Sequence, residues 1–190
     1  NDATAAINAS DFTTWGNAIA ADQVELEPGK WSLDNFGQVL VATANNGKTF
    51  TWNPGATSPL TVRSSLATSG FETSNNPTAS RLTLISPTTR HLIHLGTETT
   101  IGTASTQDDM FIRFSGQEDI NTFTPTSTNT AGTLRIQDGT KIMGALKTKE
   151  AILIWTDNAL YSMKFVGAPF IFGIEQVGTN CGLVGSTAAI

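Results

Sequence analysis

From Trp31 onward, apolar residues recur in short runs of strand length, separated by stretches rich in Gly, Pro, Asn, Ser and Thr. In residues 48–52 the alternation has a period of two, so Lys48, Phe50 and Trp52 share one face and the threonines the other. Runs of this length, bounded by turn formers, are typical of β-strands. We expect strands at residues 38–43, 48–52, 81–85, 91–95, 110–114, 133–136, 141–145, 151–155, 159–165 and 170–172, with a weaker signal at 61–63.

Two dipeptides, Asn46-Gly47 and Asp138-Gly139, are of the type that closes tight β-hairpins, because both residues tolerate positive φ. The second dipeptide predicts a hairpin between residues 133–136 and 141–145. Two more hairpins are expected, with connections at residues 86–89 and 156–158. The chain therefore consists mainly of antiparallel neighbours.

Three hairpin units share one pattern, an apolar strand followed by a turn and a second strand that carries aromatic residues. Leu40, Ile93 and Leu153 mark corresponding centres, 53 and 60 residues apart. Periods of about 40–50 residues suggest the blades of a β-propeller. We predict an all-β, β-propeller-like fold, a partial propeller from a longer protein. A β-sandwich built from unrelated hairpins is the alternative.

Residues 1–30 carry little strand signal and predict an N-terminal extension or loop, with a short helix at 15–20 as the less favoured reading. Residues 31–190 are expected to form the propeller-like domain, as part of a larger one. The chain starts at Asn1 rather than Met, and its apolar tail at 183–190 reads like a strand awaiting neighbours. We expect a fragment of something longer.

Composition narrows the class of protein. Only 14% of the residues are charged, the net charge is -5, and the sequence pI is about 4.9. An acidic chain lacks the strongly basic footprint of nucleic-acid-binding domains. No apolar run reaches the ~18 residues of a membrane-spanning helix. The single cysteine, Cys181, excludes an internal disulfide, and we expect it to be a small buried apolar residue.

Six segments carry a family resemblance in a matching order: residues 31–37, 90–96, 113–119, 152–163, 165–170 and 178–183. They resemble motifs of large virion structural proteins of tailed bacteriophages, most strongly at 152–163. The segment 113–119 is similar to the family's Ser-Asp-Gln-Glu-Asp stretch, with Gly116 where Asp is usual. A more distant likeness is to the tail hub or nozzle proteins of short-tailed phages, often called DNA stabilisation proteins.

The resemblance implies a non-enzymatic structural protein of the virion, a component of the tail hub or nozzle. It implies assembly in the bacterial host cytoplasm, with copies of itself and other tail proteins, around the DNA exit channel. DNA would pass through this channel without sequence-specific contacts. The structural motif residues of the resembling segments are Trp31, Asp34, Gln117, Glu118, Asp119, Trp155, Asp157 and Tyr161.

Candidate chemistry is sparse, and we expect no catalytic, cofactor or metal site. His91 and His94 fall on opposite faces of one predicted strand, so they cannot ligate one metal ion there. The acidic pairs 108–109 and 118–119 read as loop charges or turn caps, with Ca²⁺ binding and glycosidase chemistry as the weaker alternatives. The stretch 117–119 would hold a loop by accepting backbone hydrogen bonds.

The tryptophans keep a second function open, a carbohydrate-binding β-module of lectin-like or host-receptor-binding type. Exposed aromatic rings could stack on sugars. Trp52 and Trp155 occupy strand positions, and burial between sheets is the first expectation for both.

Overall fold

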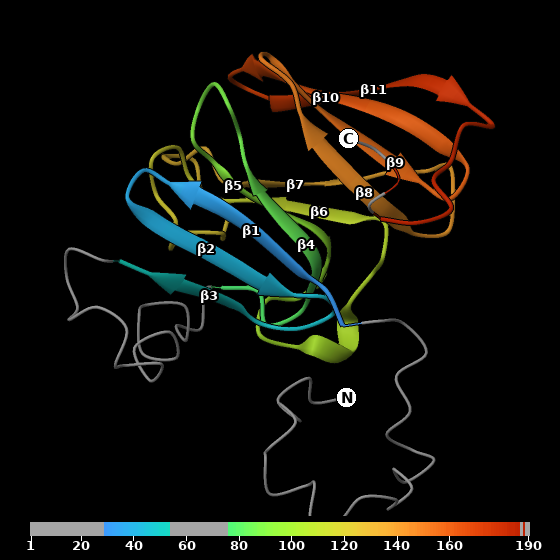
Figure 1. Cartoon of the computed structure of the whole chain (residues 1–190). Coiled ribbons are helices and arrows are strands. Elements are labelled where there is room, and N and C mark those ends of the chain that lie inside the picture. Colours follow the sequence, from blue (N-terminus) through green and yellow to red (C-terminus); the bar gives the residue numbers. More distant parts are fainter. Residues whose placement is uncertain (1–28, 54–75, 187, 189–190) are drawn as a thin grey trace, which may run out of the picture.

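The computed structural model describes residues 29–53, 76–186 and 188. The predictions for the extension before residue 29 and for a strand at 61–63 lie outside these residues. Within the described part the chain is all-β, with eleven strands in three antiparallel sheets (Figure 1). This confirms the predicted fold class. No helix of the described part is long and apolar enough to cross a membrane.

Each sheet is a meander whose strands follow one another in chain order. Sheet 1 contains β1 (Trp31–Phe36), β2 (Val39–Ala44) and β3 (Thr49–Trp52). Sheet 2 contains β4 (Ser80–Ile85), β5 (Leu92–Thr97), β6 (Phe111–Phe114) and β7 (Gly132–Arg135). Sheet 3 contains β8 (Ile142–Lys147), β9 (Ala151–Thr156), β10 (Ala159–Gly167) and β11 (Ile171–Thr179). A short 3-10 helix, η2 (Ala104–Thr106), lies between β5 and β6.

The sheets form a stack with sheet 2 in the middle. One face of sheet 2 packs on sheet 3 through the larger apolar core. The contributors from the two sheets include Leu84, Ile93, Leu95, Ile112 and Phe114 against Ile152, Ile154, Met163 and Phe172. The opposite face packs on sheet 1 through a smaller cluster around Val41, Ile85 and Leu92, closed by Phe123 from a loop. Antiparallel sheets packed face to face occur both between propeller blades and in β-sandwiches, so the stack agrees with either predicted arrangement.

The three predicted centres occupy equivalent places. Leu40 lies in β2, Ile93 in β5 and Leu153 in β9, which is the second strand of each sheet. The predicted hairpins around them, β2–β3, β4–β5 and β9–β10, are all present. The hairpins themselves are not equivalent, because β4–β5 joins the first two strands of its sheet, whereas β2–β3 and β9–β10 join the second and third.

The hairpin predicted at Asp138-Gly139 is wrong. Both flanking strands exist, but β7 pairs only with β6 and β8 only with β9, so the dipeptide crosses from sheet 2 to sheet 3. Its turn chemistry serves another contact: the Asp138 carboxylate accepts a hydrogen bond from Asn158 Nδ2 at 2.7 Å. Gly139 has a φ of 116° and lies against Thr156, where a side chain would clash.

Burial of Trp52 and Trp155 between sheets is also wrong, since both are only half-buried. In β3 the buried positions are Thr49 and Thr51. The Thr43 hydroxyl lies 2.7 Å from both the Thr49 and the Thr83 hydroxyl, so these threonines satisfy one another inside the stack. The alternation in the sequence was correct, but hydroxyl pairing places the polar face inward.

Two expectations for the C-terminal segment fail as well. Cys181 is exposed rather than buried. Residues 181–186 form no strand; they run beside the β9–β10 turn, with backbone bonds from Cys181 to Asn158 and from Leu183 to Thr156. Gly182 permits this approach, because a Cβ there would lie 2.0 Å from the Asp157 carbonyl oxygen. Of residues 187–190, only 188 is described.

Candidate functional site

The first strands of the three sheets meet along one line. The Asp34 carboxylate on β1 accepts a hydrogen bond from the Ile85 amide of β4 at 2.7 Å. It also forms an ion pair with Lys147 of β8, at 2.6 Å. Ser32, two residues earlier, accepts the Thr83 amide of β4 at 3.0 Å. We call these five residues the first-strand seam. It ties the first strands of the three sheets together.

The outer face of sheet 1, which faces away from sheet 2, is apolar. Strand alternation and the pairing register place five large apolar side chains on it: Trp31, Leu33, Leu40, Phe50 and Trp52. Trp31 is 60% exposed and Leu33 64%. The Trp31 and Phe50 rings have centroids 5.9 Å apart. We call this surface the sheet-1 end face; large exposed apolar patches mark interaction sites.

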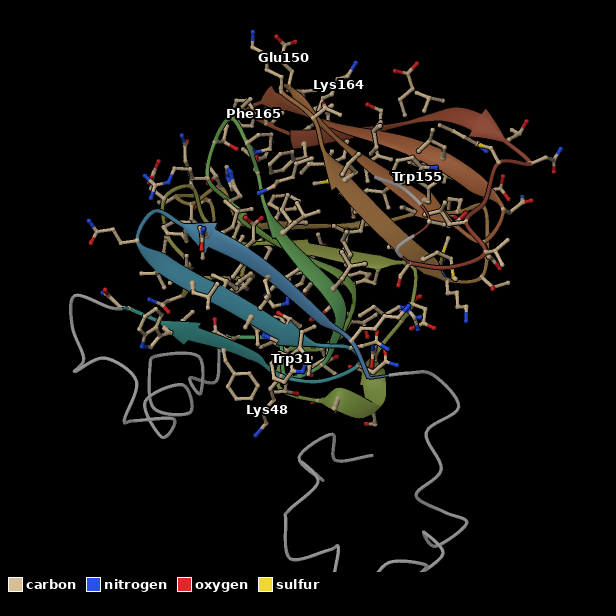
Figure 2. All side chains as sticks on the ribbon, in the orientation of Figure 1. Trp31, Lys48, Glu150, Trp155, Lys164 and Phe165 are labelled. Carbon is tan, nitrogen blue, oxygen red and sulfur yellow. The ribbon has the colours of Figure 1, made fainter. Side chains whose placement is uncertain are left out.

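The outer face of sheet 3 is apolar too. Ile152 and Ile154 point into the core, so the alternate residues of β9 point away from it. This sheet-3 end face comprises Leu146, Leu153, Trp155 and Leu160, all half-buried. Part of it is covered by the C-terminal segment, whose Leu183 and Ser186 lie against Gly144. Trp31 and Trp155 thus lie on separate end faces of the stack (Figure 2).

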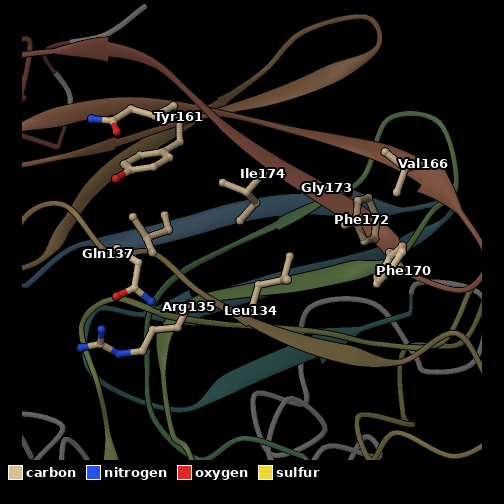
Figure 3. Close-up of a pocket in the computed structure, with 11 residues that line it drawn as sticks. Leu134, Arg135, Gln137, Tyr161, Val166, Phe170, Phe172, Gly173 and Ile174 are labelled. Atoms are coloured by element: carbon tan, nitrogen blue, oxygen red, sulfur yellow. The ribbon is translucent and has the colours of Figure 1, made fainter.

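An open groove of about 560 Å³ runs between the last strands of sheets 2 and 3 (Figure 3). Phe170 and Val166 stand at one end of it and Tyr161, Gln137 and Arg135 at the other (Figure 3). Phe170 is 77% exposed. Sheets 2 and 3 are therefore tightly packed near their first strands and separate towards their last, so the pair is wedge-shaped.

The acidic motif predicted at 117–119 organises the loop after β6. The Asp119 carboxylate accepts the Asn121 amide at 2.8 Å, and the Gln117 amide donates to the Thr130 hydroxyl at 2.7 Å. Glu118 forms an exposed ion pair with Arg90 at 3.0 Å. Only Asp119 acts in the predicted way, by accepting a backbone amide; Gln117 donates its own amide and Glu118 pairs with a side chain.

Asp157 and Tyr161 anchor the crossover between sheets 2 and 3. Asp157 accepts hydrogen bonds from both the hydroxyl and the amide of Thr140. These bonds, the hydroxyl first, lower the pKa of the Asp157 carboxyl. The buried Tyr161 accepts the Asp138 amide at 3.0 Å through its hydroxyl. Trp155, from the same segment, contributes to the sheet-3 end face instead.

The two histidines are fully buried on opposite sides of sheet 2. His91 packs edge-on against Phe172 and Phe114 of the larger core. His94 packs against Phe123 on the side of sheet 1, with Nδ1 2.7 Å from the Ser80 hydroxyl. Burial lowers the pKa of His91 to about 4. Burial, with the charge of Arg113 as a second cause, lowers that of His94 to about 3.

The sequence reasoning missed one buried carboxylate, Glu98, which has no exposed surface. It accepts the amides of Gly102 at 2.7 Å and Thr78 at 2.9 Å, together with the Thr78 hydroxyl. The signal was available in the turn-forming residues just after Glu98, which leave amides for a carboxylate to accept. Its role is to hold two loops, since all these partners are donors from the chain itself.

The two residues of the acidic pair 108–109 contact two different arginines. Asp108 contacts Arg135 at 2.7 Å and Asp109 contacts Arg81 at 3.3 Å. Burial alone would raise the pKa of Asp108, but the hydrogen bonds from Arg135 and the Met110 amide outweigh it, and the pKa is lowered. In the part of the chain that the structure describes, no group of three His, Cys, Asp or Glu side chains could hold a metal ion.

In comparisons with known proteins, no protein-family model and no curated protein matches the chain. The likeness of residues 31–190 to phage virion proteins therefore stays a prediction. What the geometry offers is a stack of sheets with two apolar end faces and a polar seam.

Proposed function

We propose that the protein is a non-enzymatic structural component of a phage tail, at the hub or nozzle, which assembles with copies of itself and other tail proteins around the DNA exit channel. Its place would be the virion. The observation that carries this proposal is the stack of meander sheets with an apolar face at each end. Such a stack can bury its end faces against further sheets.

Two further features support a structural role. Most titratable groups of the described part are engaged in holding loops and sheets, as for Asp34, Asp157 and Glu98. The ordered motifs of residues 31–190 favour the tail family over other β-proteins. The work done by such a protein is mechanical: it seals or guides the genome conduit.

The charge of the chain suits a conduit. Phosphate binding needs clustered Lys and Arg. Here 11 basic residues are outnumbered by 16 acidic ones, and Arg81, Arg90, Arg135 and Lys147 are paired with carboxylates. A wall of this kind lets DNA slide along it rather than adhere.

The test is immunogold labelling of tailed particles from the source of the gene, with an antibody raised against the purified chain. We expect label at the tail, and none when the antibody is first absorbed with the chain. Label confined to the soluble fraction, with no tail labelled, would contradict the proposal.

The exposed Trp31 ring, which lies beside the half-buried Phe50 ring, favours a second candidate, a carbohydrate-binding module in which Trp31 stacks on a sugar. A glycan array separates the two proposals. Specific micromolar binding that Trp31→Ala abolishes, and that Val184→Ala leaves intact, would favour the carbohydrate-binding module. A blank array together with ring-shaped particles in negative stain would favour the tail component.

A further inference from the structure

The hairpin that joins β10 to β11 extends past the end of β9. The last β10 residue that pairs with β9 is Lys164, opposite Ala151. Beyond it, among the described strands, β10 pairs with β11 alone. The residues that follow therefore form a two-stranded projection at one end of sheet 3. We call residues 165–170 the hairpin tip.

The hairpin tip is apolar and exposed. Its sequence, Phe-Val-Gly-Ala-Pro-Phe, contains no side chain that can form a hydrogen bond, and the apolar run continues to Ile174. Phe170 is 77% exposed, Val166 58% and Phe165 40%. Apolar side chains that gather in water mark sites of interaction with proteins or membranes.

The hairpin tip stands on a firm base. The Phe165 ring centroid lies 5.9 Å from that of Phe172 and 6.3 Å from that of His91, and both of these residues are buried. One side of the tip is thus attached to the larger core, while Val166 and Phe170 stand at the end of the groove (Figure 3). Side chains presented on a fixed support lose less conformational entropy when they bind.

Exposed charges lie at the base of the hairpin tip. Lys164 immediately precedes the tip, and the neighbouring turn between β8 and β9 carries Lys149 and Glu150. Figure 2 shows Glu150, Lys164 and Phe165 together, at the end of the molecule opposite Trp31. Two lysines against one glutamate give this end a positive balance, although the whole chain has a net charge of -5.

We propose that the hairpin tip inserts into the interfacial layer of a lipid bilayer, with Lys149 and Lys164 among the headgroups. This inference goes beyond the proposed structural role and does not depend on it. The tip rests in the interface and does not span the bilayer.

Three features favour a lipid surface over a protein partner. The tip is convex, so a protein would need a matching cavity, whereas a bilayer adapts to its shape. The tip offers no side-chain hydrogen bond, whereas protein interfaces carry about one hydrogen bond per 100–200 Å². The lysines at its base complement the negative charge of phosphate headgroups.

The length of the projection fits the interfacial layer. Strand residues rise by about 3.3 Å each, so Gly167 reaches about 10 Å beyond Lys164. Apolar faces of interfacial segments lie about 5–10 Å below the headgroups. Lysine side chains at the base can extend to the headgroups while their stems cover apolar surface.

Flotation of the purified chain with vesicles of three parts phosphatidylcholine to one part phosphatidylglycerol tests the inference. The chain should float with the vesicles, and Phe170→Asp should weaken binding at least about tenfold, because a buried phenyl ring is replaced by a charge. Val184→Asp, the same kind of change at a 99% exposed position of the C-terminal segment, is the matched control and should float. Equal melting temperatures show that both variants fold.

The lysines give a second, smaller effect. Lys164→Gln should weaken binding to these vesicles about fivefold and leave binding to pure phosphatidylcholine unchanged. Lys48→Gln, an exposed lysine at the opposite end of the molecule, is the matched control and should change neither (Figure 2). Equal losses from the two lysine variants would show that the tip is not the end that meets the bilayer, which would overturn the proposal.

An environment-sensitive fluorophore locates the contact. In a Cys181→Ser background, a label on Phe170→Cys should brighten and shift to the blue when vesicles are added, and a label on Val184→Cys should not. No flotation, flotation that Phe170→Asp leaves intact, or equal responses from the two labels would overturn the proposal. A label at residue 170 that responds to added tail particles but not to vesicles would assign the tip to a protein partner instead. Immunogold labelling tests the tail role separately: vesicle binding without label at tails retains this inference and rejects that role.

Discussion

The two interfaces inside the stack have opposite chemistry. Between sheets 2 and 3 the contact consists mainly of Ile, Leu, Met and Phe side chains, with Tyr161 and His91 among them. Between sheets 1 and 2 a small apolar cluster shares the contact with Thr43, Thr83 and the carboxylate of Asp34. The apolar interface supplies most of the burial. The polar interface fixes one register, because each hydroxyl and amide is satisfied only when its partner lies opposite.

The largest effect is expected in the apolar interface. Ile154 is fully buried between sheets 2 and 3, so Ile154→Ala leaves a cavity and should cost about 2–5 kcal/mol of unfolding free energy. Urea unfolding followed by tryptophan fluorescence measures it. Val166→Ala on β10, at a 58% exposed position, is the control and should cost little. Equal costs for both variants would contradict the placement of the core.

Acid should weaken both interfaces, since each contains a buried histidine. The pKa values of His91 and His94 in the folded chain, about 4 and about 3, lie below the ordinary 6.5. The unfolded chain therefore binds protons first, and stability falls as pH drops below about 6.5, by up to roughly 1.4 kcal/mol per pH unit for each histidine. Above about pH 7 these two groups make no further difference.

Urea titrations at pH 7.5, 6.0 and 5.0 measure this loss. His91→Phe keeps an aromatic ring in the larger core. It should reduce the dependence of the unfolding free energy on pH without abolishing it, because His94 still titrates. A pH-independent stability between 7.5 and 5.0 would show that neither imidazole is held neutral.

A smaller loss of unfolding free energy is expected from changes in the seam, which is part of the polar interface. Asp34→Ala leaves the Ile85 amide and the Lys147 ammonium without their acceptor, which should cost about 1–3 kcal/mol. Asp34→Asn keeps an acceptor for the amide and should fall between. Glu150→Ala, on an exposed turn, is the control, expected within about 0.5 kcal/mol of the unmodified chain. Differential scanning calorimetry ranks the three variants.

The smallest effect is expected from a single hydroxyl. Thr83→Val removes one partner of Thr43, which still pairs with Thr49, so the cost should be about 0.5–1.5 kcal/mol. Thr128→Val, on an exposed loop, controls for the change of side chain. A cost as large as that of Ile154→Ala would mean that the hydroxyl network, and not the apolar core, dominates the stability of the stack.

The positions of the strands could be predicted because strand length, period and turn residues are local signals. Which face of sheet 1 points inward could not, because a threonine face is buried only when hydroxyls on other strands, such as Thr83, meet it. The same holds for Asp138-Gly139, whose local turn chemistry is used for a contact with Asn158 across two sheets. Glu98 was missed because a buried carboxylate depends on amides that only the folded loops bring together.

The candidate surfaces were partly predictable. Trp31 and Asp34 were singled out from the resembling segments, and they lie on the sheet-1 end face and in the seam. Trp155 was expected in the core and lies on the sheet-3 end face, because the core of β9 is formed by the alternate residues Ile152 and Ile154. Periodicity alone does not say which of two apolar faces meets a neighbour.

The seam also bears on what happens while many copies fold at once. β4 is the first strand of its sheet, and such an edge strand offers free amides to any stray strand. The amides of Thr83 and Ile85 are instead taken by side chains of β1. This edge is therefore closed to amyloid-like growth as soon as sheet 1 docks, and newly made copies are protected there from joining one another in the wrong way.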